Sequence, residues 1–306
     1  MLDPRGPAAD RIEGIWWLML WISVGVFAVV LLMMAMAMWR GRNSSMLALD
    51  KDDVRWGTPF VIGAGIVVPA LILSGLFVFS LREMNALAAP GRDASLEIRV
   101  IAHDWWWEVR YPNGAVTANE IHIPVGEAVR VALDTADVIH SFWVPQLQVK
   151  ADHIPGRTTS VWLEADDPGR FRGQCAEFCG LQHANMAFFV VAQQSDEFDD
   201  WLAAQAAPAR EPESPREQAG SEIFLSSSCS GCHAVRGTSA NGDLAPDLTH
   251  VGSRSTIAGG ILEATRSNLV GFISDPHRYK PGVTMPPTEL SRSEIEAVVD
   301  YLEGLE

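Results

Sequence analysis

Two short clusters contain all four cysteines of the 306-residue chain. The first, "QCAEFCGLQHANM" (174–186), combines two cysteines with a histidine and a methionine. The second is "CSGCH" (229–233). Thiolate, imidazole and thioether groups are ligands for soft and borderline metals. Both clusters are therefore candidate metal sites, and the four cysteines divide evenly between them.

The first cluster is compatible with a disulfide, a zinc site or a copper site. Zinc sites favour four Cys or His ligands without methionine. Cys179, His183 and Met186 instead supply the thiolate, imidazole and thioether of a cupredoxin electron-transfer site. His140 in "DVIHSFWVP" supplies the upstream histidine that such a site needs. Since a mononuclear site uses one thiolate, the additional Cys175 indicates two coppers bridged by both sulfurs.

The second cluster has the C-x-x-C-H spacing of covalent haem attachment, with Cys229 and Cys232 as the thiols and His233 as the iron ligand. A zinc half-site is the alternative, but it would need two more ligands, and no cysteine follows the motif. Beyond residue 85 the chain has only two methionines. Met186 belongs to the first ligand set, so Met285 in "GVTMPP" is the predicted sixth iron ligand.

The first cluster lies in a segment, residues 92–202, whose pattern predicts an all-β domain. Its apolar runs are short, rich in Val, Ile, Phe and Trp, and separated by turn sequences such as "YPNG" and "DDPGR". Many short strands of this kind predict a sandwich or barrel. The expected strands are 96–102, 128–134, 158–164 and 186–192.

A Pro-, Ala- and charge-rich segment, residues 203–218, predicts an extended linker. The following segment, residues 219–306, has a helical pattern. "SRSEIEAVVDYLEGL" begins with a capping box formed by Ser291 and Glu294. It continues with an apolar stripe on one helix face. The stripe consists of Ile295, Val298, Val299 and Leu302.

Two apolar runs, residues 14–39 and 56–81, predict a transmembrane hairpin within residues 1–91. A bilayer core about 30 Å thick needs roughly 20 apolar residues in a helix. A cleavable signal peptide is the alternative for the first run, but its apolar core would be shorter and small residues would follow it. Positive charges gather between the runs, which predicts a cytoplasmic loop and external chain ends. They are Arg40, Arg42, Lys51 and Arg55.

The chain carries a formal net charge of −15. An acidic surface of this kind repels nucleic acid and can attract a basic protein partner, although solubility alone would also explain it. A nucleic-acid-binding function is therefore not expected.

The order of these segments resembles cytochrome c oxidase subunit II, with its binuclear copper centre, CuA. The C-terminal segment, with "GSEIF" before the haem motif and "MPP" after it, resembles a class I cytochrome c, as in caa-type oxidases. The resemblance implies a two-helix transmembrane hairpin, an all-β cupredoxin-like domain and an all-α cytochrome c domain. It implies CuA ligation by His140, Cys175, Cys179, His183, Met186 and the main-chain carbonyl of Glu177.

Further expectations follow from the same resemblance. The Glu177 carboxylate would help to hold a magnesium ion at the interface with subunit I. In "HDWWWEVRYP", Trp105 matches the residue that accepts electrons, although tryptophan also fills β cores. The family usually carries a glutamate near the outer end of the second span to start a proton path. Ala89 aligns with it here, and Glu83 is the nearest acid.

The function that the resemblance implies is electron entry into a haem-copper terminal oxidase that translocates protons. A cytochrome c or a quinol-oxidising complex would reduce haem c, and electrons would then reach CuA and the oxygen-reducing subunit I. Subunit III is a further expected partner, and the chain itself has no oxygen site. The expected location is a bacterial inner membrane, with both termini and the metal domains outside.

Two alternatives remain at this stage. The chain could be the CuA and haem c electron-transfer subunit of a nitric oxide reductase, or a stand-alone membrane-tethered electron carrier. In every case a linker of this length gives the haem domain roughly millimolar effective concentration beside the copper. Transfer between the two domains would then not need tight docking.

Overall fold

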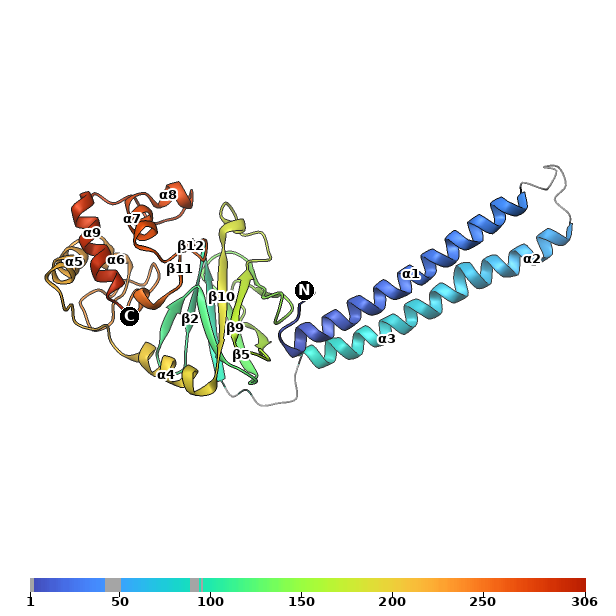
Figure 1. Ribbon diagram of the computed structural model, residues 1–306, viewed down its shortest axis with the longest axis horizontal. Coiled ribbons are helices and arrows are strands. Elements are labelled where there is room, and N and C mark those ends of the chain that lie inside the picture. Colours follow the sequence, from blue (N-terminus) through green and yellow to red (C-terminus); the bar gives the residue numbers. More distant parts are fainter. Residues whose placement is uncertain (1–2, 42–50, 89–93, 95) are drawn as a thin grey trace. The chain divides into compact units, whose positions relative to one another are not determined.

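The structure is a computed structural model that describes residues 3–41, 51–88, 94 and 96–306. The chain divides into two compact units. One is Asp10–Gly91, and the other combines Met1–Ala9 with Arg92–Glu306. The described residues of the first unit are helical, and the second unit contains the strands and both cysteine clusters (Figure 1).

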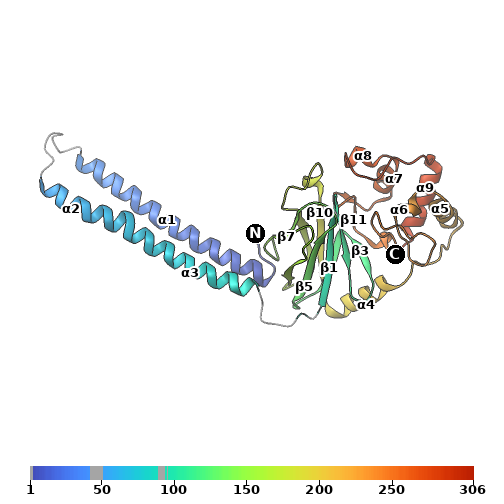
Figure 2. The same cartoon turned by 180° about the vertical axis from the view of Figure 1, so that it is seen from behind.

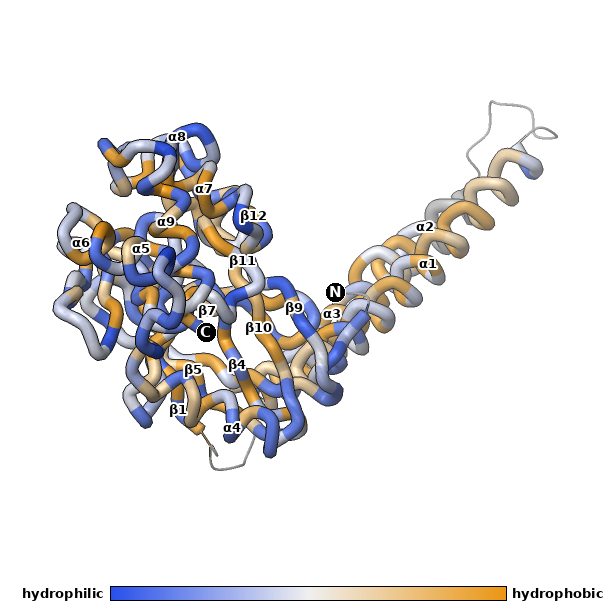
Figure 3. The backbone as a smooth tube through the Cα atoms, turned by 60° about the vertical axis from the view of Figure 1, so that its left-hand side comes forward, coloured by the Kyte–Doolittle hydropathy of each residue, from blue (hydrophilic) through white to orange (hydrophobic). Residues whose placement is uncertain are grey.

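The helical unit is a hairpin of two long helices. The first is α1 (Pro7–Gly41), and the second runs through α2 (Lys51–Ile62), a π-helical segment (Gly63–Val67) and α3 (Val68–Ala88). Both are long and apolar enough to span a membrane, with mean hydropathies of 2.6 and 2.5. Apolar residues dominate along their length (Figure 3). Both predicted apolar runs are therefore helical.

Glu83 lies near the C-terminal end of the second helix of the hairpin, and its carboxylate is paired. The Arg11 Nη1 atom lies 3.0 Å from Glu83 Oε2, which joins the start of α1 to the end of α3. Ala89, which aligns with the family glutamate, lies outside the described residues, and so does Arg42 of the predicted cytoplasmic loop.

The β segment forms two sheets that pack as a sandwich (Figures 1 and 2). β1 pairs with β5 in parallel and with β2 in antiparallel fashion. The five-stranded sheet has the order β3 (Val116–Ala118), β2 (Trp106–Arg110), β1 (Leu96–His103), β5 (Val129–Thr135) and β8 (Thr159–Leu163). The three-stranded sheet has the order β4 (Glu120–Pro124), β10 (Ala187–Gln193) and β9 (Gly169–Gln174), and β6 (His140–Phe142) pairs with β7 (Ala151–His153). All four predicted strands are present.

The sandwich is held by alternating inward-facing residues of both sheets. In β1 the side chains of Ile98 and Val100 are fully buried, while their neighbours face outward. Three aromatic side chains fill the centre, with Phe142 and Phe188 stacked at 4.6 Å and Trp107 against Phe188 at 5.1 Å between ring centroids. Burying a large apolar side chain contributes about 1.5–3 kcal/mol. This core fixes strand β6, which carries Phe142, against strand β10, which carries Phe188.

A helix and a short irregular segment connect the sandwich to the C-terminal domain. α4 (Ser195–Ala206) follows β10, and residues 207–214 have no helix or strand. α5 (Pro215–Ser226) begins inside the segment assigned to the linker. It begins there because the Ser214 side chain accepts a hydrogen bond from the Glu217 amide and proline occupies the first helical position.

The C-terminal domain is built from short helices around its own apolar core. Its last helix has the predicted capping box of Ser291 and Glu294, and all four residues of the predicted stripe are buried. A short two-stranded ribbon, β11 (Thr256–Ile257) and β12 (Leu262–Glu263), is added to the helices. The remaining helices are α6 (Cys229–Cys232), α7 (Arg266–Ser274), α8 (Pro276–Tyr279) and α9 (Arg292–Glu303).

The close crossing of α5 and α9 depends on Gly220. A Cβ atom at this position would collide with the main-chain carbonyl of Ala297, which is backbone and has little room to move. Gly220→Ala is therefore expected to destabilise the C-terminal domain by roughly 1–3 kcal/mol through overpacking. Urea unfolding of the full chain, followed by pulse proteolysis and mass spectrometry of this segment, measures the effect.

The control is Glu222→Ala on the same helix, because this side chain is exposed. Its effect should stay within about 0.5 kcal/mol, as for most surface substitutions. Equal urea midpoints for the Gly220→Ala variant and the original chain would show that α5 and α9 can move apart without loss of stability.

Candidate functional site

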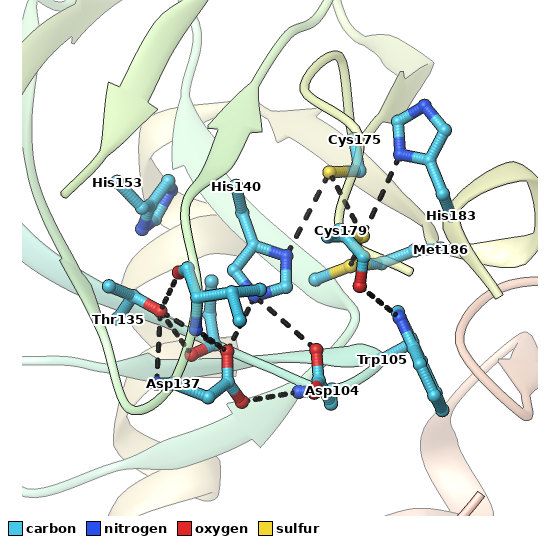
Figure 4. A network of polar contacts seen from close by, with 12 residues as sticks. Asp104, Trp105, Thr135, Asp137, His140, His153, Cys175, Cys179, His183 and Met186 are labelled. Atoms are coloured by element: carbon cyan, nitrogen blue, oxygen red, sulfur yellow. Dashed lines mark hydrogen bonds and ion pairs between the residues drawn. The ribbon is translucent and has the colours of Figure 1, made fainter. Parts of the chain in front are cut away.

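The structure brings the first cluster and its predicted upstream histidine together at one end of the sandwich (Figure 4). His140 opens β6, and the loop between β9 and β10 carries the remaining ligand candidates. Because β9 and β10 are antiparallel neighbours, the loop returns to its starting point. The residues gathered there are His140, Cys175, Cys179, His183 and Met186.

Two thiols form the centre of this site, and each faces an imidazole. The Sγ atoms of Cys175 and Cys179 lie 3.7 Å apart, and both cysteines are free and buried. The Nδ1 atom of His140 lies 3.9 Å from Cys175 Sγ, and Nδ1 of His183 lies 3.6 Å from Cys179 Sγ. A disulfide has an S–S distance of about 2.05 Å. The arrangement is that of two sulfurs open to shared ligation, with an imidazole at each end.

A thioether and a carbonyl complete the donor set. Met186 Sδ lies 3.8 Å from Cys179 Sγ, and Met186 is fully buried. The main-chain oxygen of Glu177 lies 3.2 Å from Cys175 Sγ, while the Glu177 side chain is exposed. Soft sulfur ligands, imidazoles and a carbonyl suit copper. The donors present therefore fit a binuclear copper centre.

The pKa values of the two thiols are shifted in opposite directions by their contact. The hydrogen bond from Cys179 lowers the pKa of Cys175, and the same interaction raises the pKa of Cys179. Two sulfurs this close together in a buried site resist carrying two charges at once. Metal ions between them would remove that conflict, because the thiolate is the form that binds metal.

Asp137 is a residue that the sequence analysis missed. Its Oδ1 atom accepts a hydrogen bond from His140 Nε2 at 2.7 Å, and its Oδ2 atom accepts one from the Asp104 amide at 2.7 Å. Burial acts to lower the pKa of His140, but hydrogen bonds to Asp137 and Cys175 outweigh it and raise the pKa to about 9. Asp137 thus fixes the ring so that Nδ1 faces the sulfurs. Its position three residues before His140 in "DVIH" was the available signal.

Trp105 contacts the cysteine loop directly. Its Nε1 atom donates a hydrogen bond of 2.8 Å to the main-chain oxygen of Cys179, and the side chain is half-buried. Trp107, two residues later, fills the core instead. The structure therefore places Trp105 against the candidate copper ligands, within the predicted aromatic segment.

The second cluster lies on a single helical turn of the C-terminal domain. α6 carries Cys229 and Cys232, and His233 follows directly as its C-cap. The His233 Nδ1 atom donates a hydrogen bond of 2.7 Å to the Pro246 carbonyl, which leaves Nε2 available to bind a metal. Burial lowers the pKa of His233 and favours the neutral ring that ligates iron. Met285 packs against the same apolar core as Cys229, and the donor types present, two thiols, an imidazole and a thioether, suit a covalent haem.

Two family models match this chain, one in the β sandwich and one in the C-terminal domain. Residues 115–193 match the model for the periplasmic domain of cytochrome c oxidase subunit II. Residues 217–306 match the model for cytochrome c. The two matched segments contain the two cysteine clusters, one in each.

Proteins named cytochrome c oxidase subunit 2 are similar over most of the chain. Cytochrome c oxidase subunit 2 of Alkalihalophilus pseudofirmus is 36% identical over 99% of this chain and 90% of its own length. Cytochrome c oxidase subunit 2 of Bacillus subtilis is 32% identical over 83% of this chain and 74% of its own length. Among solved structures, the periplasmic domain of subunit II of cytochrome oxidase from Bradyrhizobium japonicum is 33% identical, covers 37% of this chain and 95% of its own, and has a TM-score of 0.36.

The hydrogen bond between Asp137 and His140 is testable by metal affinity. Asp137→Asn keeps the size of the side chain but removes the charge that orients the imidazole. We expect copper affinity of the full chain to fall about 10- to 100-fold, as for other residues that hold metal-ligating histidines. Competition with a copper chelator measures it.

Asp134→Asn is the matched control, since Asp134 lies on the neighbouring strand and pairs with Arg99 rather than with a ligand candidate. Its copper affinity should equal that of the original chain. If both variants bind copper equally well, Asp137 does not position His140.

Proposed function

The chain belongs to the cytochrome c oxidase subunit II family, and from this premise we propose that it is the electron-entry subunit of a haem-copper terminal oxidase. The observation that carries the proposal is the paired thiols of Cys175 and Cys179, with His140 Nδ1 and His183 Nδ1 facing one sulfur each. Relatives of this kind are parts of oxidoreductase complexes, and this chain supplies the entry point for electrons.

The first proposed cofactor is CuA, which takes up and releases single electrons. Cys175 and Cys179 would hold the copper ions together with the imidazoles of His140 and His183. Met186 and the Glu177 carbonyl complete the set. Because the loop between β9 and β10 is anchored by strands at both ends, the ligands stay in place when the charge of the centre changes. The Glu177 carboxylate, which is exposed, is the proposed magnesium ligand at the subunit I interface.

The second proposed cofactor is haem c, a one-electron carrier. Cys229 and Cys232 would attach the porphyrin covalently, and His233 and Met285 would ligate its iron. The Pro246 carbonyl holds the His233 ring in the correct tautomer. A methionine and histidine pair raises the potential of the iron and makes the domain a good electron acceptor.

The chain is a membrane protein with its metal domains outside the membrane. We place it in the bacterial inner membrane with both termini on the outer side, beside subunit I and subunit III. A cytochrome c or a quinol-oxidising complex donates electrons to the C-terminal domain. Trp105, which touches the Cys179 carbonyl, is the proposed entry residue of the copper domain.

Purification with associated subunits tests the function. The complex should contain two coppers and one covalent haem for each copy of this chain, besides the metals of subunit I, and it should consume oxygen. Cys175→Ser should remove the copper pair and oxygen consumption yet leave the covalent haem absorbance unchanged, because the two clusters lie in separate cores. A copper pair that survives in Cys175→Ser, or nitric oxide turnover in place of oxygen consumption, would contradict the proposal.

Met285 is tested by its own substitution. Met285→Ala should open the sixth position of the haem iron, so that the reduced chain binds carbon monoxide at the covalent haem. Optical difference spectra at that haem measure the binding, and Met84→Ala, in α3 of the hairpin, is the control. An unchanged haem spectrum in Met285→Ala would mean that another residue ligates the iron.

A further inference from the structure

Lys280 is an unusually buried lysine at the end of α8. Only 3% of its surface is exposed, and its Nζ atom donates a hydrogen bond of 2.7 Å to the main-chain oxygen of Trp105. Lysine is almost never fully buried unless it is paired. Burial lowers the pKa of this amine to about 8. Among the residues that the structure describes, no carboxylate forms an ion pair with it, so the Trp105 carbonyl is its principal partner.

Pro281, the residue after Lys280, contacts the loop between β9 and β10 that carries the two cysteines. The Gln182 side chain is buried, and its Nε2 atom donates a hydrogen bond of 2.7 Å to the Pro281 carbonyl. Gln182 lies between Cys179 and Met186, inside the proposed ligand loop. Lys280 therefore contacts Trp105, and the next residue, Pro281, contacts the loop between β9 and β10.

A third contact comes from the turn between β11 and β12. The Gly259 carbonyl accepts a hydrogen bond of 2.9 Å from the Ala187 amide, directly after Met186. Gly259 has φ +73°, and a Cβ atom there would lie 2.5 Å from Lys280 Nζ and 3.0 Å from the Trp105 oxygen. Only glycine lets the turn approach this closely. The lysine, the turn and the tryptophan carbonyl thus pack together without space for another side chain.

We propose that Lys280 locks the C-terminal domain against Trp105, so that the approach to the copper domain is occupied by the chain's own haem domain. This inference rests on the proposed function, because it assigns the contact a role in electron transfer. It revises the expectation that a flexible tether suffices. Lys280 is a positioning residue, five residues before Met285 on the same loop. An external donor then delivers its electron to the haem domain and does not dock on Trp105.

The first test measures access to the amine in the unsubstituted chain. The chain has three lysines, and Lys150 is exposed whereas Lys280 is buried. The purified complex is treated with acetic anhydride, and acetylation of each lysine is followed by mass spectrometry, natively and in urea. Native Lys280 should react more than about ten-fold more slowly than Lys280 in urea, because acylation needs the contact to open. Less protection than this would overturn the proposal.

The second test measures the consequence for electron transfer. Lys280→Leu removes the donor, and Arg278→Leu removes a charge from an exposed residue of the same segment. The haem is reduced by a laser-excited ruthenium complex, and electron arrival is followed by the near-infrared absorbance of the copper pair. In Lys280→Leu the rate constant should fall roughly ten-fold or more, because the haem domain loses its hydrogen bond to the Trp105 carbonyl and is no longer held in register with that residue. Arg278→Leu should remain within about two-fold of the original chain.

Optical spectra and potentials of both cofactors must be unchanged in Lys280→Leu, because a positioning residue alters the rate and leaves the cofactors alone. An unaltered rate with both cofactors present would overturn the proposal. Acetylation does not depend on either cofactor. Failure of the contact is thereby distinguished from failure of the proposed function, which would appear as missing copper or haem.

Discussion

The organisation of the soluble unit depends on holding two cysteine sulfurs 3.7 Å apart in a buried site without a bond between them. Such a pair is unfavourable when both thiols must ionise, since a charge on Cys175 opposes ionisation of Cys179. It persists because β9 and β10 fix both ends of the cysteine loop and β6 brings His140 from another part of the chain. The rest of the sandwich, with Trp107 at its centre, provides the rigid support that this geometry requires.

The two metal sites are encoded in different ways. Cys229, Cys232 and His233 follow one another on a single helical turn, so their spacing is recognisable without any knowledge of the fold. The copper ligands also occupy one loop, but His140 joins them only through strand pairing. A local motif can be recognised from the sequence alone. A site that is assembled by strand pairing can be identified only when the positions of the strands are known.

This difference explains what could be predicted from the sequence. The apolar runs, the helix after Ser291 and the cysteine clusters follow from local patterns, and the structure has each of these elements. The strand β4 has only five residues, Glu120–Pro124, so its alternating pattern is short, and its pairing with β10 is set by tertiary contacts. Asp137 and Lys280 were missed for the same reason. Carboxylates and lysines are usually solvated, and only the fold shows that one orients an imidazole and the other is enclosed.

The contact of the C-terminal domain with Trp105 and the loop between β9 and β10 uses main-chain carbonyls, amides and a single enclosed lysine, with no ion pair at Lys280 among the described residues. Elsewhere the two domains are joined by hydrogen bonds from Ser255 to the buried Glu120 carboxylate and from Arg236 to the Gly114 carbonyl. Mobile ions screen charges across solvent over about 8 Å at physiological ionic strength, and they act weakly on groups that water does not reach. The step between the domains should therefore be nearly indifferent to salt. The association of a basic soluble electron carrier with this acidic chain should weaken as salt rises. Ionic strength therefore distinguishes electron transfer between the two domains from electron delivery by the external carrier.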